Sequence, residues 1–212
     1  MRVILASSST RRRDWISNQH WMNGHQIEFR SMDIDESRYS IEGDVPATVR
    51  NIANAKASHA GRSLGVKRGD WVALVSDTLV EGPASKVALG KPLDALEAEN
   101  MLRSLSGKRH YVHSCTGLIT SSREITWELF SDTCEVHMRP LKDSDLEELV
   151  ETGSWKGKAG GYDIKGLAAK HLEIIDGDEI TVLGFSSKAM ERLREILSVD
   201  IFASGESDSP VL

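Results

Sequence analysis

The sequence has few cysteines, no long hydrophobic run and no excess of basic residues. Its 212 residues include only two cysteines, Cys115 and Cys134, and their separation fits no metal-binding motif. No apolar run approaches the roughly 20 residues that a membrane span needs, so no membrane partner is expected. A formal net charge of −6 argues against a nucleic-acid partner, although it leaves room for a local basic pocket.

The low cysteine content also indicates the cellular compartment in which the protein is expected. Both cysteines lie in strand-like stretches, and reduced thiols in a cytoplasmic protein are expected. The short N-terminal apolar patch is followed by arginines, which is the wrong order for a signal peptide. We expect one α/β domain over residues 1–202 and a flexible C-terminal tail over residues 203–212.

A strand-turn-helix pattern opens the chain. The apolar run over residues 2–6 predicts a buried strand, the hydroxyl residues 7–10 a turn, and residues 10–22 a helix. Exposed N–H groups and the positive end of the helix dipole would meet at this turn. Arg11 and Arg12 add positive charge, which favours binding of a polyanion such as a nucleotide's phosphates, whereas Arg13 is expected to be solvated. The alternative is a surface turn with solvated arginines.

A long helix is predicted from Asp44, its N-cap, through Pro46 in its first turn to about Ser63. Lys56 falls on the apolar stripe of this helix. Its ammonium group either reaches the solvent at the edge of the stripe or points into a polar cavity, and the pattern is compatible with both.

Candidate carboxylates come from two places. The apolar run over residues 71–76 predicts a buried strand that ends at Asp77 and Thr78, where α/β proteins place metal ligands and catalytic bases. An Asp that caps a turn is the alternative. The second source is the acidic cluster Asp33, Asp35 and Glu36.

The rest of the chain reads as alternating helices and strands. We expect a hairpin over residues 79–89, a helix from Asp94 to Gly107, two antiparallel strands over residues 111–119 and 124–138 joined by the turn 120–122, a short helix from Ser144 to Glu151, short strands over residues 171–176 and 179–183, and a helix over residues 186–197.

A glycine-rich loop over residues 153–166 carries Lys156, Lys158 and Lys165. Such a loop lets the backbone approach a ligand closely, although a plain surface loop is the alternative. With Lys91, these cations and the carboxylates form the inventory for hydrolysing a phosphoanhydride with Mg²⁺ or Mn²⁺. No nucleophile elbow is present, so direct attack by water is expected.

Seven short motifs resemble, in order, those of the Maf family of nucleoside triphosphate pyrophosphatases, over about residues 3–185. They are L-A-S-S-S-T-R-R at residues 5–12, D-E at 35–36, A-K-A at 55–57, S-D-T at 76–78, G-K-P at 90–92, M-L-R-S-L-S-G at 101–107 followed by His110 and Val112, and K-A-G-G-Y-D-I at 158–164.

The resemblance implies an elongated, mixed-sheet, two-lobed α/β fold of the inosine triphosphatase type, with the nucleotide in a central cleft. It implies hydrolysis of a nucleoside triphosphate to the monophosphate and pyrophosphate with a divalent metal, in a homodimer. Carried over by position, the expected catalytic residues are Asp77, Glu36, Lys56 and Lys91, with Asp77 and Glu36 also binding the metal and Asp77 as the base. The expected substrate-binding residues are Ser7, Arg11, Arg12, Thr78, Lys158, Tyr162 and Lys165.

Three departures from the family pattern stand out: Thr10 replaces a proline, Lys165 replaces a glutamine, and Phe185-Ser186 replaces leucine-proline. Asp77-Thr78 and the loop motif favour the branch that acts on dTTP and UTP. The alternatives are the branch that acts on 7-methyl-GTP, a non-catalytic nucleotide-binding regulator of cell division, and a sugar-nucleotide or phosphoryl transferase.

Overall fold

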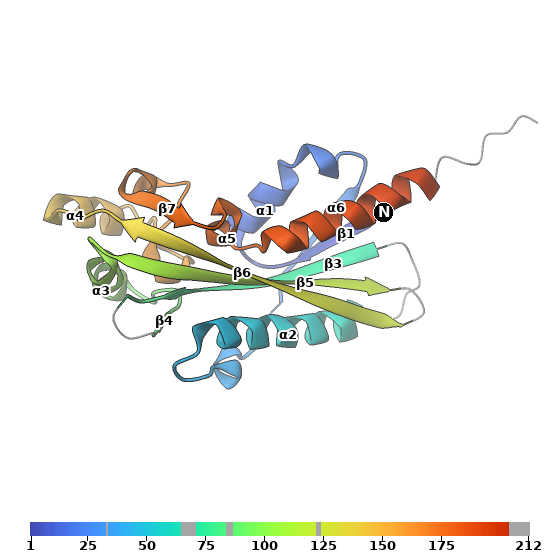
Figure 1. Cartoon of the computed structure of the whole chain (residues 1–212), viewed down its shortest axis with the longest axis horizontal. Coiled ribbons are helices and arrows are strands. Elements are labelled where there is room, and N and C mark those ends of the chain that lie inside the picture. Colours follow the sequence, from blue (N-terminus) through green and yellow to red (C-terminus); the bar gives the residue numbers. More distant parts are fainter. Residues whose placement is uncertain (33, 65–70, 84–86, 122–123, 204–212) are drawn as a thin grey trace, which may run out of the picture.

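The structure, a computed structural model, describes residues 1–32, 34–64, 71–83, 87–121 and 124–203 (Figure 1). Asp33 of the acidic cluster, part of the predicted hairpin (84–86), Ser122 of the predicted turn and residues 204–212 of the predicted tail lie outside this described part.

The described strands form one mixed sheet of seven strands in the order β2-β1-β3-β5-β6-β7, with β4 paired to β3. β1 is parallel to both of its neighbours, and the other pairs are antiparallel. The strands are β1 (Arg2–Ala6), β2 (Gln26–Arg30), β3 (Trp71–Glu81), β4 (Ala88–Leu89), β5 (Arg109–Ser121), β6 (Ile125–Met138) and β7 (Leu172–Asp176).

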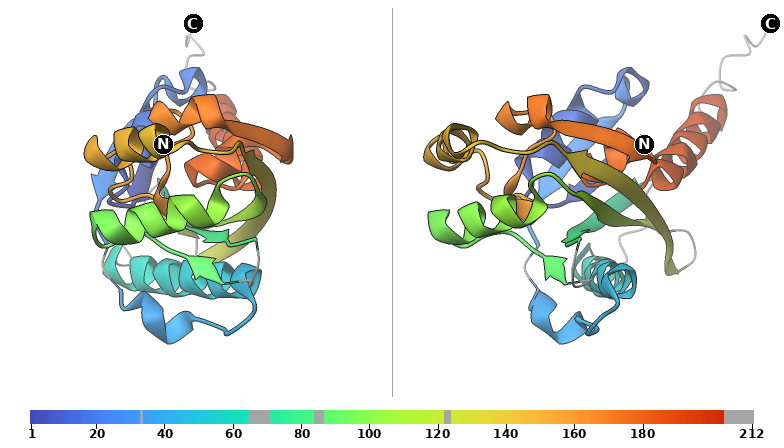
Figure 2. Two further views of the ribbon diagram at one scale, coloured as in Figure 1. Left: turned by 90° about the vertical axis from the view of Figure 1, so that its left-hand side faces the viewer. Right: turned by 60° about the vertical axis from the view of Figure 1, so that its left-hand side comes forward.

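Helices cover both faces of this sheet. The α-helices are α1 (Thr10–Ser17), α2 (Val45–Leu64), α3 (Ala95–Leu105), α4 (Asp143–Glu151), α5 (Glu179–Leu183) and α6 (Ser187–Ala203). Short 3-10 helices lie at η1 (His20–Met22), η2 (Glu36–Tyr39), η3 (Ala159–Gly161) and η4 (Leu167–His171). α2 covers one face, and α1 and α6 cover the other (Figures 1 and 2).

The side chains of β1 alternate between two cores, because successive residues of a strand point to opposite faces. Val3 and Leu5 belong to the core beneath α1 and α6. Ile4 and Ala6 belong to the core beneath α2. Burial on both faces explains why the strand is a continuous apolar run.

A third core lies at the other end of the molecule, where α3, α4 and β7 gather (Figures 1 and 2). Leu102 and Leu105 of α3 and Leu146 and Leu149 of α4 pack there against the end of β6. The long strands β5 and β6 run through both ends and join the two lobes (Figure 1). The predicted mixed-sheet, two-lobed α/β architecture is confirmed.

Two local predictions are confirmed by specific hydrogen bonds. Asp44 Oδ1 accepts a hydrogen bond from the Ala47 N–H at 2.9 Å at the start of α2. Asp94 Oδ1 accepts one from the Glu97 N–H at 2.8 Å and caps α3. The predicted antiparallel pairing of β5 with β6 is also observed.

Several predicted boundaries were wrong. α1 ends at Ser17, where Asn18 is the C-cap and its side-chain amide donates to the Asp14 carbonyl at 2.8 Å, and residues 20–22 form a separate 3-10 turn. α4 begins one residue earlier than predicted, with the Lys142 N–H donating to Asp145 Oδ2. α6 extends to Ala203, six residues beyond Leu197 and into the first position of the predicted tail.

Residues 179–183 are a helix, and the predicted strand was wrong. The Thr181 N–H donates to the Asp178 carbonyl at 3.0 Å, which starts the helical turn. The turn ends at Gly184, whose φ of +116° is a conformation that L side chains rarely adopt.

Asp77 does not end its strand as predicted, because β3 continues to Glu81. The parallel register with β1 ends at Leu5↔Leu74, whereas the antiparallel pairing with β5 continues through Asp77 to Glu81. Asp77 therefore lies just beyond the carboxyl end of β1, which is the place where parallel α/β sheets present functional groups.

Candidate functional site

The turn between β1 and α1 brings hydroxyl groups to the N-terminus of α1. Ser7 is buried, and its Oγ accepts a hydrogen bond from the Ser9 N–H at 3.2 Å. The Ser9 side chain caps the helix by accepting from the Arg12 N–H at 3.5 Å. The first turn thus has the local geometry that an anion site requires.

The Arg12 guanidinium is buried and binds four protein oxygens. Nε donates to the Gly184 carbonyl at 2.8 Å, and Nη2 donates to Thr78 Oγ1 at 2.9 Å. Nη1 donates to the Ser76 carbonyl at 3.0 Å and to Ser7 Oγ at 3.4 Å. Four of its five N–H donors therefore tie the β1–α1 turn to β3 and to the residue after α5.

The electrostatic state of Arg12 follows from this position. Burial lowers the pKa of Arg12 to about 10, while the negative charge of Asp77 acts in the opposite direction. The group therefore stays protonated at neutral pH.

The sequence predicts a solvated Arg13, and this prediction was wrong. Its Nε and Nη2 both donate to the Ser7 carbonyl, at 3.0 and 2.8 Å, and the guanidinium lies 5.5 Å from the centre of the Phe29 ring. Arg13 thus fixes the backbone of the turn from the side of β2.

Lys56 bridges the two predicted carboxylates. Its Nζ lies 2.7 Å from Asp77 Oδ1 and 2.7 Å from Glu36 Oε1. The side chains of Lys56 and Asp77 are only 13% and 8% exposed, whereas that of Glu36 is 45% exposed. The Lys56 ammonium group is therefore bound to two carboxylates and does not simply reach the solvent at the edge of the stripe.

The chemistry around Asp77 fits a divalent cation. Asp77 Oδ2 is buried and has no hydrogen-bond partner among the described residues. Leaving such an oxygen unpaired costs about 1–3 kcal/mol, so a ligand or cation that meets it would be favoured. The described residues contain no group of three or more His, Cys, Asp and Glu suited to a metal. A metal held by Asp77 and Glu36 would therefore need further oxygens, such as those of a phosphate.

A pocket of about 340 Å³ lies between the start of α1 and the glycine-rich loop. It is lined by Ser8, Ser9, Thr10, Arg11, Lys91, Lys156, Gly157 and Lys158. The Gly160 N–H donates to the Gly90 carbonyl at 2.9 Å, which holds the loop against the segment that carries Lys91. Four cationic residues and the hydroxyl turn share this pocket, which suits a polyphosphate.

Arg11 and Lys158 share a carboxylate that the sequence did not single out. Asp163 Oδ1 lies 4.0 Å from Arg11 Nη1, and Asp163 Oδ2 lies 3.4 Å from Lys158 Nζ. Burial lowers the pKa of Arg11, and the charge of Asp163 opposes this shift.

Tyr162 lies in the third core and not on the surface of the pocket. It is 2% exposed, and its hydroxyl is hydrogen bonded to His110 Nε2 at 2.9 Å. Burial raises the pKa of the Tyr162 hydroxyl well above its usual range. With Arg11 and Thr78, Tyr162 borders a cavity of about 10 Å³, which has room for about one water molecule.

Thr78 belongs to a buried chain of hydroxyl groups. Its Oγ1 accepts from Arg12 and is hydrogen bonded to Ser114 Oγ at 2.7 Å, and Ser114 Oγ donates to the Thr181 carbonyl at 2.7 Å. Thr78 and Asp77 are adjacent in β3, so their side chains lie on opposite faces of the sheet.

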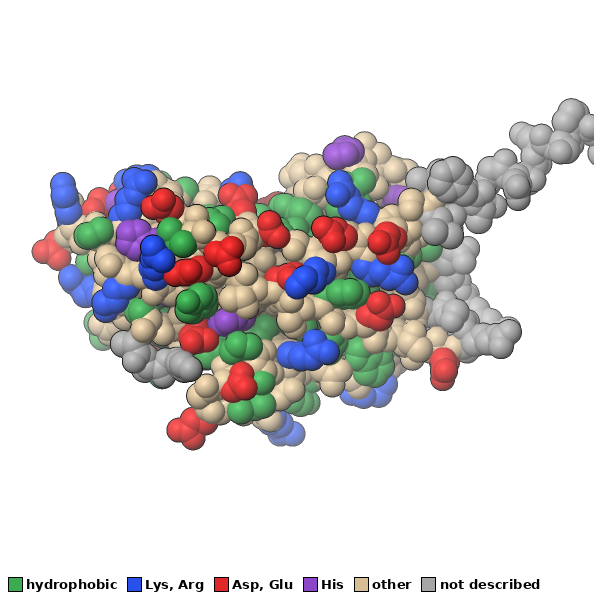
Figure 3. Space-filling view, viewed as in Figure 1, with side chains coloured by type: hydrophobic (Ala, Val, Ile, Leu, Met, Phe, Trp, Pro, Cys, Tyr) green, Lys and Arg blue, Asp and Glu red, His purple; other side chains and the backbone are tan. Residues whose placement is uncertain are grey.

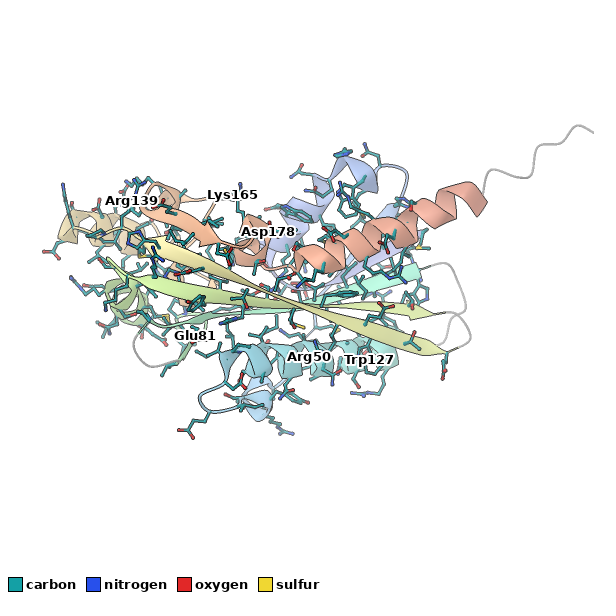
Figure 4. All side chains as sticks on the ribbon, viewed as in Figure 1. Arg50, Glu81, Trp127, Arg139, Lys165 and Asp178 are labelled. Carbon is teal, nitrogen blue, oxygen red and sulfur yellow. The ribbon has the colours of Figure 1, made fainter. Side chains whose placement is uncertain are left out.

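The Lys165 ammonium turns toward α5. Its Nζ lies 2.5 Å from Glu179 Oε1, and its side chain is 59% exposed. Figure 4 shows Lys165 on the side of the sheet that carries β7 and α5. The Lys165 backbone N–H donates to Asp163 Oδ1 at 3.0 Å, so the backbone of Lys165 and not its ammonium group is linked to the carboxylate that faces Arg11 and Lys158.

Sequence reasoning thus named most of the charged groups that the structure gathers at this end of β1, and it missed three roles. Asp163 lay inside a quoted motif, where its charge among lysines was a usable signal. Lys156 was noted but not proposed as a site residue, although it lines the pocket. The Ser7 contact of Arg13 depends on the fold of the turn and left no signal in the sequence.

The comparisons with known proteins agree with the sequence motifs. A family model described as Maf, Maf-like protein, matches residues 2–197. A protein of Acholeplasma laidlawii called dTTP/UTP pyrophosphatase is 32% identical, over 91% of this chain and 95% of that protein. A Pyrococcus furiosus protein of the same name is 34% identical, over 92% and 95%. A solved structure of the Staphylococcus aureus Ham1 protein covers 65% of this chain and 72% of its own, with 12% identity and a TM-score of 0.43. Within the described part, no helix has the length and apolarity to cross a bilayer.

Proposed function

The chain belongs to the Maf-like protein family, and from this premise we propose that it hydrolyses a nucleoside triphosphate to the monophosphate and pyrophosphate, with dTTP or UTP as substrate. The observation that carries the proposal is the buried Asp77 carboxylate, with one unpaired oxygen, at the same end of β1 as a polycationic pocket. A carboxylate with this placement suits the activation of water, and the pocket suits the leaving phosphates.

The pocket residues hold the triphosphate. The N–H groups at the start of α1 meet phosphate oxygens, and Arg11, Lys91 and Lys158 neutralise their charge. Ser7 does not line the pocket, and its proposed contact with phosphate is made by its hydroxyl hydrogen, since its Oγ accepts from the Ser9 N–H and from Arg12. Four of the Arg12 donors are bound to protein oxygens, so Arg12 offers at most one N–H to a phosphate and acts mainly by holding the turn.

The reaction needs a water molecule oriented toward the α-phosphorus. Asp77 accepts the proton of this water as general base, and its unpaired Oδ2 is the atom available for that contact. Lys56 Nζ lies 2.7 Å from Asp77 Oδ1 and is positioned to stabilise negative charge that develops on the phosphate.

Asp77 and Glu36 would hold Mg²⁺ or Mn²⁺, which supplies charge neutralisation of the phosphates when bound. Lys56 now bridges these two carboxylates, so it would give up at least one of them when the metal and the nucleotide are present.

Recognition of the nucleobase is assigned mainly to the glycine-rich loop over residues 153–166. Thr78, Tyr162 and Lys165 are the proposed neighbours of the nucleobase and sugar. Thr78 and Tyr162 act through the backbone segments that their side chains anchor. Lys165 contacts the nucleotide directly once its ammonium group leaves Glu179. The two relatives named for dTTP and UTP support this substrate class.

The experiment is a panel of canonical and modified triphosphates with separate detection of pyrophosphate and orthophosphate, with Mg²⁺ or Mn²⁺. Pyrophosphate release from dTTP or UTP is the expected result. Strong preference for 7-methyl-GTP would move the chain to that branch. Tight binding without turnover would favour the non-catalytic regulator, and a transferred group in the product would favour the transferase.

We further propose that the chain acts as a cytoplasmic homodimer, built on one domain over residues 1–202. The continuous sheet supports a single folding unit. On the face in Figure 3, acidic and basic side chains are interspersed. The expectation of no nucleic-acid partner rests on the formal net charge of −6. Light scattering coupled to gel filtration tests the dimer, and a monomer at micromolar concentration would reject it.

A further inference from the structure

Two cations that line the polycationic pocket, Arg11 and Lys158, share one carboxylate. Asp163 faces two of the cations, with Oδ2 3.4 Å from Lys158 Nζ and Oδ1 4.0 Å from Arg11 Nη1. The side chains of Arg11, Asp163 and Lys158 are 17%, 16% and 18% exposed. Because all three are mostly buried, their interactions are screened less by water and salt than those of a surface ion pair.

The backbone holds the Asp163 carboxylate in place independently of the cations. Oδ1 accepts a hydrogen bond from the Lys165 N–H at 3.0 Å, and the Gly166 N–H donates to the Asp163 carbonyl at 3.1 Å. This is an Asx turn, which orients the side chain locally. The carboxylate therefore does not depend on Arg11 or Lys158 for its position.

A phosphate chain and Asp163 would compete for the same donors. Arg11 and Lys158 both line the pocket, and each can direct its N–H groups either to the carboxylate or to phosphate oxygens. A polyphosphate in the pocket would also be repelled by the negative charge a few ångströms away.

Resting on the function proposed above, we propose that Asp163 is a resident counter-anion of the triphosphate pocket, which neutralises Arg11 and Lys158 in the empty site and weakens the hold on polyphosphate. The same competition applies to pyrophosphate, so Asp163 favours release of this product. Asp163 sets the affinity of the pocket through Arg11 and Lys158, and it does not touch the reacting atoms.

The test uses the full-length protein and the variant Asp163→Asn. Asparagine keeps a side-chain oxygen that accepts the Lys165 N–H and removes the charge. Inorganic tripolyphosphate is titrated by calorimetry at low salt without divalent metal, so that only the protein's own cations hold it. The variant is expected to bind about three- to tenfold more tightly, as the loss of a partly buried competing ion pair implies. The gain should shrink at high salt.

The matched control is Asp143→Asn, which makes the same change of net charge at an exposed ion pair with Arg103, outside the pocket. Its affinity should equal that of the wild type. A second variant, Asp163→Ser, removes the charge and keeps a hydroxyl acceptor. An increase in affinity shared by both variants is then due to the loss of charge and not to the asparagine side chain.

Unchanged or weaker tripolyphosphate binding by both Asp163 variants would overturn the inference, since a carboxylate that only positions the cations should weaken binding when lost. Turnover is scored separately. A wild-type protein that hydrolyses no nucleotide, with tighter tripolyphosphate binding by the variants, would reject the proposed function and support the counter-anion.

Discussion

At the scale of single residues, Asp77 carries the strongest prediction. Asp77→Asn should lower kcat for the preferred nucleotide by about 10²–10⁴, because the base that takes the proton from water is lost. The fold should persist, since asparagine can still accept a hydrogen bond from Lys56. Steady-state kinetics with pyrophosphate detection, together with a thermal melt, checks both statements.

Asp143→Asn, at the exposed ion pair with Arg103, is the charge-matched control and should keep full activity. Full activity of the Asp77 variant would show that another group is the base.

His110 makes stability depend on pH. Burial lowers its pKa to about 4 from the ordinary 6.5. Between these values the unfolded chain binds a proton that the folded chain does not, so the free energy of unfolding falls as the pH falls from 6.5 to 4. The loss approaches about 3 kcal/mol for this group alone. Urea unfolding at several pH values measures it. His110→Gln should flatten this part of the profile, and an unchanged profile would contradict the assignment.

The position of Lys56 on an apolar stripe is compatible with a solvated ammonium group or with a polar cavity, and the sequence alone does not decide between them. The structure places the carboxylates of Asp77 and Glu36 against this ammonium group. The burial of Arg12 and Tyr162 could not be predicted, because it depends on Gly184 and His110, which lie far away in the sequence.

At the scale of elements, the glycine-rich loop depends on Gly160. Its φ is +69°, and a Cβ there would lie 2.9 Å from Val80 Cγ2. Gly160→Ala should therefore shift the loop away from β3 and break its hydrogen bond to Gly90. We expect a loss of about 1–3 kcal/mol in stability and a higher KM, because Lys91 and Lys158 separate. Thermal melts and kinetics measure the two effects.

Gly157→Ala is the matched control in the same loop. Its φ is +73°, but nothing lies within 4 Å of the added Cβ. Gly157→Ala should therefore lower stability only through the strain of a positive φ, without a steric clash such as that with Val80. Equal effects of the two substitutions would mean that the contact with Val80 has no role.

The elements themselves were largely predictable, and the one error of element type has a physical cause. Short apolar runs do not distinguish a helical turn from a strand. Residues 179–183 were read as a strand, yet the helix-ending Gly184 decides the outcome. The long strands β5 and β6 were predictable because their length and composition leave no alternative.

At the scale of the whole molecule, polyphosphate should stabilise the fold. The pocket joins the start of α1 to the loop between α4 and β7, which belong to different cores. Tripolyphosphate at about 100 times its Kd should add about 2.7 kcal/mol to the free energy of unfolding. Differential scanning calorimetry checks this. The double variant Lys91→Ala with Lys158→Ala should show much less stabilisation, and an equal shift would place the binding site elsewhere.

The architecture and its general chemistry could be predicted from the order of motifs along the chain. The side of the sheet on which each group lies could not, because it depends on strand register. The sequence predicts ligand contacts for both Asp77 and Thr78. These residues are neighbours in β3, so their side chains lie on opposite faces of the sheet.

The contact between Arg12 and Gly184 also bears on how the protein is made. The turn of residues 7–10 leaves the ribosome early in synthesis. Arg12, which holds this turn, donates one of its hydrogen bonds to the carbonyl of Gly184, which leaves the ribosome late. The nascent chain therefore carries an incomplete nucleotide site through most of its synthesis. A prematurely terminated fragment that lacks residue 184 would hold the Arg12 guanidinium through three protein oxygens, one fewer than the whole chain.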